Sequence, residues 1–188
     1  DDVLLVIDSA YAEFVSRNDY APGIELVSAN DNVVMTRTFS KIYGLAALRL
    51  GWAYCPTEVA MVFHRVRGPF NVNAAAQAAG LAALHDVKHT DEARAHNDRW
   101  LPWLQDECDR LGLKYIPSVG NFLTIEFDED GPRSANAAQE FLRTKGILPR
   151  AIAGYGLAAH LRFTIGLEEE NRAVIEALEA FLSDTNGD

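Results

Sequence analysis

The chain has 188 residues, enough for one sizeable hydrophobic core or two small ones. Apolar residues make up 48% and charged residues 23%, the ordinary balance of a soluble globular protein. There are 27 Asp and Glu residues against 17 Lys and Arg residues, and the net charge of −10 argues against binding to nucleic acid or to an anionic membrane.

No apolar run approaches the roughly 20 residues of a membrane-spanning helix, and no signal peptide is recognised. The two cysteines, Cys55 and Cys108, have no metal-binding or redox spacing, which agrees with a reducing compartment. We therefore expect a cytoplasmic protein that does not associate with membranes.

The first half of the chain alternates short apolar runs with helical segments. Strands are predicted at Val3–Ile7, Val33–Thr38 and Leu50–Cys55. Helices are predicted from Thr57, as a possible cap, to about Arg67, over Asn73–His85 and over Val87–Leu111. The Ala- and Leu-rich second helix should be well packed, whereas the third is long, mostly exposed and ended by Gly112. Strands separated by helices predict an α/β sheet.

The run Val3–Ile7 is continuously apolar, which is typical of a strand buried on both faces of a parallel sheet. Such a strand needs neighbours on both sides and rarely begins a protein. We therefore expect this chain to be a fragment of a longer one.

The second half of the chain has a different character. Strands are predicted at Tyr115–Ile116, Asn121–Phe127, Ile147–Pro149 and His160–Ile165. Helices are predicted over Ser134–Lys145, with Ser134 as its cap and Gly146 as its stop, and over Glu168–Leu182. This pattern predicts a smaller α+β domain, and we place the boundary inside the long helix, which gives domains 1–96 and 97–188.

The segment Thr38–Trp52 carries the strongest chemical signal. Lys41 stands among hydroxyl residues and a glycine, and its amine can form a Schiff base with a carbonyl. Thr38 and Ser40 supply hydroxyl groups, and Arg49 supplies a planar guanidinium that suits a phosphate. A lysine of this kind beside phosphate ligands is what a pyridoxal phosphate site needs. The alternative is a lysine at a strand-to-loop junction, with Arg49 as an ordinary surface residue.

This segment resembles the cofactor-lysine segment of fold-type I aminotransferases, most of all the histidinol-phosphate aminotransferase branch. The shared pattern is a hydroxyl residue, any residue, Ser, Lys, then Gly and Leu-Arg-Leu-Gly. The resemblance covers only the C-terminal half of the family pattern. It implies an α/β fold, with the C-terminal part of the cofactor-binding large domain at 1–96 and a small α+β domain at 97–188. It also implies pyridoxal 5'-phosphate as cofactor, Lys41 as catalytic residue, and Thr38, Ser40 and Arg49 as cofactor ligands.

Asp8 ends a predicted strand, where open α/β sheets place ligand groups. The segment Asp8-Ser9-Ala10-Tyr11-Ala12-Glu13-Phe14 also resembles the family. The resemblance implies that Asp8 accepts a hydrogen bond from the protonated pyridine nitrogen, which keeps the ring cationic. It implies that Tyr11 bonds the phenolic oxygen of the ring. The alternative for Asp8 is a turn former at a strand end.

Arg162 lies among apolar strand residues, where a cation needs a partner. The resemblance implies that Arg162 binds a substrate carboxylate in a bidentate pair. Arg150 and Asn121 match family positions on the substrate side, Arg150 near the phosphate end. The alternatives are an internal salt bridge for Arg162 and a turn role for Asn121.

Two other patterns indicate weaker hypotheses. His85 and His89 share an i, i+4 spacing that could bind zinc with His96 as a guessed third ligand, but solvated helix histidines are the better interpretation, and we expect no metal site. Glu126 and Asp128 could be drawn as a glycosidase pair, but adjacent acids near a turn usually form a wet surface.

The predicted function is transamination of histidinol phosphate with 2-oxoglutarate, in histidine biosynthesis. The predicted partners are a small-molecule amino donor, a 2-oxo acid and a second copy of the chain in a homodimer. One alternative is a related enzyme with the same cofactor, an aromatic amino acid aminotransferase or a phosphothreonine-type decarboxylase. The other is a catalytically incomplete fragment that acts at most as a binding module.

Overall fold

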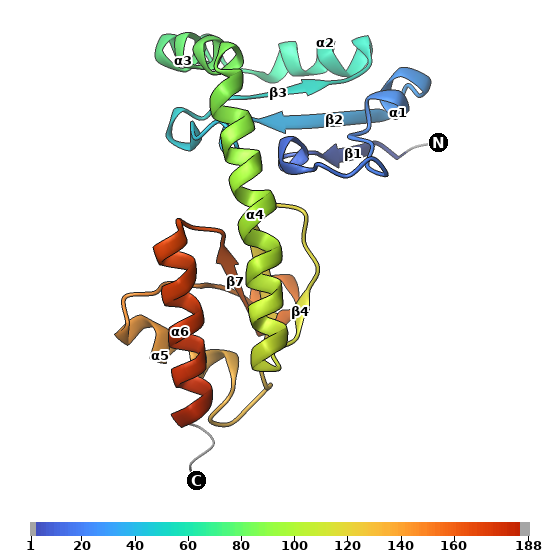
Figure 1. Ribbon diagram of the computed structural model, residues 1–188. Coiled ribbons are helices and arrows are strands. Elements are labelled where there is room, and N and C mark those ends of the chain that lie inside the picture. The colour runs from blue at the N-terminus through green and yellow to red at the C-terminus, as the bar shows by residue number, and fades with distance from the viewer. Residues whose placement is uncertain (1–2, 185–188) are drawn as a thin grey trace. The chain divides into compact units, whose positions relative to one another are not determined.

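The computed structural model describes residues 3–184, and the chain forms two units, Asp1–Ala95 and His96–Asp188 (Figure 1). Helix α4 (Val87–Leu111) contributes residues to both units. The roles predicted for domains 1–96 and 97–188 stay predictions, because the division alone does not assign them. Within residues 3–184, no helix combines the length and the apolar character that crossing a membrane requires.

The first unit contains a three-stranded sheet in the order β1-β2-β3. Its strands are β1 (Leu5–Asp8), β2 (Val33–Thr38) and β3 (Gly51–Tyr54). Strand β1 pairs parallel to β2, and β3 pairs antiparallel to it. Its helices, besides the start of α4, are α1 (Ile24–Ala29), α2 (Thr57–Val66), α3 (Ala74–His85) and the short 3₁₀ helices η1 (Ala12–Phe14) and η2 (Ala46–Leu48).

A small core joins α1 to one face of this sheet. Val33 and Met35 alternate along β2 and so share a face, where they pack with Val27 of α1 and with the partly buried Ile7. Helix α1 was not anticipated from the sequence. It has only six residues, too few for a helical period to stand out.

The strand predicted at Val3–Ile7 forms, but its predicted burial on both faces is wrong. Leu5 and Val6 are 48% and 54% exposed. The reason is that β1 lies at the edge of the sheet and, within residues 3–184, pairs with β2 alone. Leu5 and Val6 therefore have little cover in this unit, whereas Ile7 packs against the small core.

Two predictions about the helices of this unit are also corrected. Thr57 is the first residue of α2 rather than its cap, which is Pro56. Helix α3 is capped by Asn73, whose side chain accepts the Ala76 N–H at 2.8 Å, but it is not well packed: it buries only alanine and glycine positions, and Leu81 is 61% exposed. The Ala-rich composition reflects helix propensity rather than burial.

The second unit contains a four-stranded antiparallel sheet in the order β4-β5-β7-β6. Its strands are β4 (Tyr115–Ile116), β5 (Phe122–Glu126), β6 (Arg150–Ile152) and β7 (Leu157–Thr164). Its helices, besides the end of α4, are α5 (Ala135–Thr144), α6 (Glu168–Asp184) and the 3₁₀ helix η3 (Ala153–Tyr155).

The strand predicted at Ile147–Pro149 is wrong, because β6 begins only at Arg150. The end of α5 occupies the intervening backbone: the N–H of Ile147 donates to the Leu142 carbonyl at 3.0 Å, and Gly146 takes a left-handed φ of 76°. Pro149 has no backbone N–H that could donate a hydrogen bond to a neighbouring strand. The helix stop at Gly146 was predicted, but the turn that ends the helix extends through Ile147, where a strand was expected.

One continuous core holds the second unit together. Helices α4, α5 and α6 and strands β5 and β7 contribute to it. Its buried side chains include Trp100, Leu104 and Cys108 of α4, Leu123 and Ile125 of β5, Leu161 and Phe163 of β7, and Leu178 and Phe181 of α6. Helix α4 therefore has one fully buried face in this unit and is less exposed than its charged composition indicates.

Candidate functional site

Lys41 and Tyr11 meet in the first unit. Strand β2 ends at Thr38 and delivers Lys41 three residues later, while Tyr11 immediately precedes η1. The Lys41 Nζ lies 5.0 Å from the centroid of the Tyr11 ring, and both residues are partly buried. A cation over an aromatic face is attracted to it, so the ring gives the amine a defined direction.

Asp8 is the last residue of β1, and its side chain is exposed. Its Oδ1 accepts the Ala10 N–H at 3.1 Å and the Thr36 hydroxyl at 3.5 Å. Among the described residues, no group donates a hydrogen bond to Oδ2. Asp8 thus acts as a turn former through one oxygen, and the other is available to an external donor.

Ser40 and Arg49 converge beside Lys41. The Nη1 of Arg49 lies 3.5 Å from the Ser40 hydroxyl oxygen and 2.7 Å from the Ala46 carbonyl, to which it donates. Arg49 follows η2 with a left-handed backbone, φ 54°, which is uncommon for a residue other than glycine. The hydroxyl of Thr38 accepts the Ser40 N–H at 3.0 Å and so supports the turn. A guanidinium and a hydroxyl placed together in this way suit an anion.

The loop that contains Lys41 is held by contacts that the sequence did not indicate. Ile42 is buried, and its carbonyl oxygen lies 3.1 Å from Nε2 of His89 in α4. His89, considered above as a zinc ligand, therefore anchors the lysine loop. Within residues 3–184, no group of three or more His, Cys, Asp or Glu side chains gathers as a metal site would require.

Tyr43, two residues after Lys41, has a shifted pKa. Burial raises the pKa of its phenol, the Glu13 carboxylate raises it further, and the Arg37 and Arg94 cations lower it by smaller amounts. The phenol therefore stays protonated at neutral pH. No local spacing could have indicated this cluster, because Glu13 and Arg94 are 81 positions apart.

In the second unit, Arg150 and Arg162 lie directly opposite each other across strands β6 and β7. The guanidinium of Arg162 lies over the Phe122 ring, 5.0 Å from its centroid, and its buried Nε has no hydrogen-bond partner within residues 3–184. Two like charges opposite each other repel, and a partly buried guanidinium with an unpartnered Nε calls for a counter-anion.

The two arginines line a cleft of about 510 Å³. Among the described residues, no carboxylate comes within ion-pair distance of either arginine, so the internal salt bridge considered for Arg162 does not form there. This cleft is suited to an anionic ligand. Asn121 is not among its described lining residues, and its backbone carbonyl accepts the Ile165 N–H at 2.9 Å.

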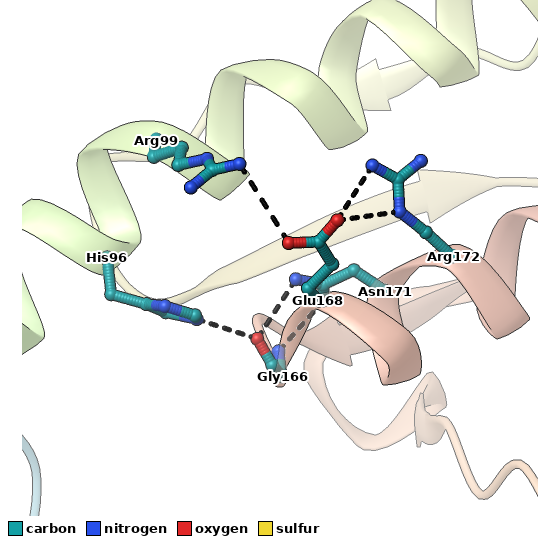
Figure 2. A network of polar contacts seen from close by, with 6 residues as sticks. All are labelled: His96, Arg99, Gly166, Glu168, Asn171 and Arg172. Carbon is teal, nitrogen blue, oxygen red and sulfur yellow. Dashed lines mark hydrogen bonds and ion pairs between the residues drawn. The ribbon is translucent and has the colours of Figure 1, made fainter.

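A polar network fixes the turn that follows β7 (Figure 2). The carbonyl of Gly166 lies 2.8 Å from His96 Nε2 and accepts the Asn171 side-chain amide at 2.9 Å, while Asn171 Oδ1 accepts the Gly166 N–H. Glu168 accepts two hydrogen bonds from Arg172 and pairs with Arg99 at 3.8 Å. His96, guessed above as a third zinc ligand, is instead part of this turn. Because Gly166 lines the cleft, the network also shapes the surroundings of Arg162.

Comparison with known proteins assigns the family. The model of the family described as "Aminotransferase class I and II" matches residues 1–178. The chain belongs to the class I and II aminotransferases. This membership confirms the resemblance recognised in the sequence, and the α/β fold class agrees with the solved structures of the family.

Individual aminotransferases are similar over nearly the whole chain. The histidinol-phosphate aminotransferase of Paramagnetospirillum magneticum is 59% identical over 181 residues, and that of Rhodopseudomonas palustris is 48% identical over 183 residues. These matches cover 96% and 97% of this chain but 50% of each relative. The chain therefore spans about half the length of the curated relatives it matches.

Among solved structures, the histidinol-phosphate aminotransferase of Sinorhizobium meliloti in complex with pyridoxal-5'-phosphate superimposes with a TM-score of 0.85 at 29% identity. The match covers 97% of this chain and 49% of that one. The roles of the individual site residues, from Asp8 to Arg162, stay predictions.

Proposed function

We propose that this chain supplies part of the active site of a pyridoxal phosphate-dependent aminotransferase that moves the amino group of histidinol phosphate to 2-oxoglutarate. The observation that carries the proposal is the approach of Lys41 Nζ to 5.0 Å from the Tyr11 ring. It brings a candidate nucleophile and a tyrosine ring together in one unit. The 59% identity to a histidinol-phosphate aminotransferase supports the choice of substrate.

The residues present fit the cofactor. An amine is available at Lys41, a hydroxyl and a guanidinium lie 3.5 Å apart at Ser40 and Arg49, and Asp8 has a carboxylate oxygen without a donor in the described part of the chain. When bound, pyridoxal phosphate supplies an aldehyde for the substrate amine and a ring that withdraws electrons from Cα.

Each residue has a distinct task in this proposal. Lys41 would hold the cofactor through its amine and, as a free amine, would take the proton from the substrate Cα as general base and deliver it as general acid to the aldehyde carbon of the cofactor. Ser40 and Arg49 would orient the phosphate, with Thr38 supporting their turn, and the Asp8 carboxylate would stabilise a proton on the ring nitrogen. Tyr11 donates to the ring oxygen.

In the second unit, the cleft residues would bind the substrates. Arg162 would hold a carboxylate of the oxo acid in a bidentate pair, and Arg150 would hold the phosphate of the amino donor. Asn121, which directly precedes β5 and is not among the described lining residues of the cleft, is assigned to the substrate by the family resemblance alone. The buried Nε of Arg162, which has no hydrogen-bond partner within residues 3–184, supports this assignment, since the guanidinium is left for a ligand.

The proposal includes a cytoplasmic homodimer. The first unit exposes several large apolar side chains, which include Phe63 at 45% and Phe70 at 95%, and burial of such side chains at an interface would favour association. The two free cysteines, Cys55 and Cys108, support a reducing compartment.

Cofactor trapping tests the proposal directly. The chain is mixed with pyridoxal phosphate, reduced with borohydride, digested and mapped by mass spectrometry. We expect a single labelled peptide that carries the adduct on Lys41, and no label in the Lys41→Arg variant. The matched control is Lys88→Arg, because Lys88 lies in the same unit with its side chain 83% exposed. An absence of adduct on Lys41 in the unmodified chain contradicts the proposal.

The reaction type is tested with two substrates, on unreduced chain that has bound pyridoxal phosphate. Appearance of pyridoxamine phosphate with histidinol phosphate supports amino transfer. Release of carbon dioxide from phosphothreonine, without amino transfer, contradicts the proposed reaction and indicates a decarboxylase.

A further inference from the structure

Glu13 and Arg37 form an ion pair that is largely removed from water. Their Oε1 and Nη1 atoms lie 2.6 Å apart, and the side chains are only 15% and 13% exposed. The pair of Lys88 and Glu92 in the same unit is, by contrast, an ordinary surface pair, 83% and 68% exposed at 3.6 Å. The burial of the first pair calls for an explanation that a surface pair does not need.

Two more groups join this buried pair. Nε of Arg94 in α4 donates to the backbone carbonyl of Glu13 at 2.9 Å. Tyr43 lies close enough that the charges of Glu13, Arg37 and Arg94 all act on its pKa. Four residues from separate segments of the first unit therefore form one cluster.

The cluster links the segments that carry the candidate site residues. Glu13 belongs to η1, which directly follows Tyr11, and Arg37 is the next-to-last residue of β2, which leads to Lys41. Tyr43 comes two residues after Lys41. The ion pair therefore joins the Tyr11 turn to the strand that delivers Lys41.

Stability alone explains this pair poorly. Removing two charges from water costs much of what their attraction returns, so buried ion pairs are weak stabilisers compared with apolar packing. The buried Nε of Arg37 adds to this cost, because within residues 3–184 it has no hydrogen-bond partner. What such a pair does supply is a fixed distance and direction between two segments.

We propose that Glu13 and Arg37 are positioning residues, which hold the Tyr11 ring against Lys41 and thereby direct the lysine amine toward the cofactor. Neither residue needs to touch cofactor or substrate in this role. The inference rests on the proposed function, because it concerns the same lysine. It gives a role to two residues that the proposed function leaves without one.

The test compares charge-removing variants in the cofactor-trapping experiment. Glu13→Gln keeps the shape of the side chain and removes its charge. We expect capture of pyridoxal phosphate at Lys41 to slow by about 10- to 100-fold, because a misplacement of a reacting group by about 1 Å can cost about 100-fold. The matched control is Glu92→Gln, which removes the carboxylate of the exposed pair in the same unit and should leave capture unchanged.

A double variant separates positioning from stability. Glu13→Gln combined with Arg37→Gln leaves no unpaired buried charge, so thermal unfolding followed by Trp52 fluorescence should recover relative to either single variant. Capture should stay as slow as in the single variants, because the link between the segments is still absent. Glu13→Asp retains the charge and should restore most of the capture rate.

Failure of the positioning role and failure of the proposed function give different results in these experiments. If the unmodified chain forms no adduct on Lys41, the proposed function fails. If the unmodified chain forms the adduct and the double variant captures the cofactor at the same rate, the proposed function stands and the positioning role is overturned. The double variant also decides the question if Glu13→Gln alone does not fold.

Discussion

The two units of this chain bury their apolar residues very differently. In His96–Asp188, Leu104, Leu123 and Leu178 are at most 1% exposed within one continuous core. In Asp1–Ala95, the edge strand β1 leaves Leu5 and Val6 about half exposed, and the core shared by α1 and β2 is small. The unit with the candidate catalytic lysine therefore depends less on apolar burial than its neighbour in sequence.

In the first unit, specific polar contacts hold the segments around the candidate lysine in place. The Glu13–Arg37 ion pair and the contacts of His89 and Arg94 with backbone carbonyls fix the segments around Lys41. Such contacts fix direction well but add less net stability than buried apolar surface. We therefore expect the two units to differ in their response to substitution and to pH.

The largest expected difference concerns the loss of an apolar side chain from each unit. Leu123→Ala removes a fully buried side chain from the second unit and should lower its free energy of unfolding by about 2–5 kcal/mol, because it leaves a cavity. Val6→Ala in the first unit should cost less than about 1 kcal/mol, since its side chain is already 54% exposed. Urea unfolding followed by tryptophan fluorescence, with Trp52 in the first unit and Trp100 and Trp103 in the second, measures both. Equal losses would remove the contrast between the units.

The next difference appears at alkaline pH. Burial raises the pKa of Cys108 in the second unit to about 12 from an ordinary value of 9.0. Above pH 9 the unfolded chain loses the thiol proton while the folded chain retains it, so stability is complete below pH 9 and falls as pH rises toward 12. The expected slope is about 1.4 kcal/mol per pH unit.

Replacing this thiol provides the control. Cys108→Ala should remove that slope from the pH dependence of urea unfolding, whereas Cys55→Ala in the first unit should leave it in place. A thiol reagent applied to the folded chain should label the partly exposed Cys55 and spare Cys108. Rapid labelling of Cys108 in the folded chain would show that the second core is looser than the structure indicates.

The smallest expected effect is one that the units should share. Asn73 caps α3 in the first unit, and Ser134 caps α5 in the second, each by accepting a backbone N–H. Asn73→Ala and Ser134→Ala should each lower stability by about 1 kcal/mol, because a cap acts locally and does not depend on the surrounding core. A several-fold difference between the two, measured by urea unfolding, would show that capping is coupled to packing in one unit.

Much of the fold could be predicted from the sequence where a local pattern was long or sharply bounded. The strand Val33–Thr38 and the helix Val87–Leu111 form with the predicted bounds, and the predicted cap at Ser134 is confirmed. The burial of Val3–Ile7 could not be predicted, because the pattern of a strand records which side chains are apolar and not whether another element covers them.

The candidate site shows the same division. Asp8, Tyr11, Ser40 and Lys41 stand out because they lie in two short motifs, and the structure places the lysine against the tyrosine. The pairing of Glu13 with Arg37 could not be foreseen, since the partners are 24 positions apart and neither lies at a spacing that marks an ion pair.

The backbone of Arg49 has a consequence for anyone who engineers this chain. A left-handed conformation at a residue with a Cβ costs of order 1 kcal/mol or more, and glycine would adopt it without that cost. A search for stabilising substitutions guided by backbone geometry alone would therefore select R49G early. That choice would remove the guanidinium beside Ser40, so gain in stability and loss of anion binding are opposed at a single position.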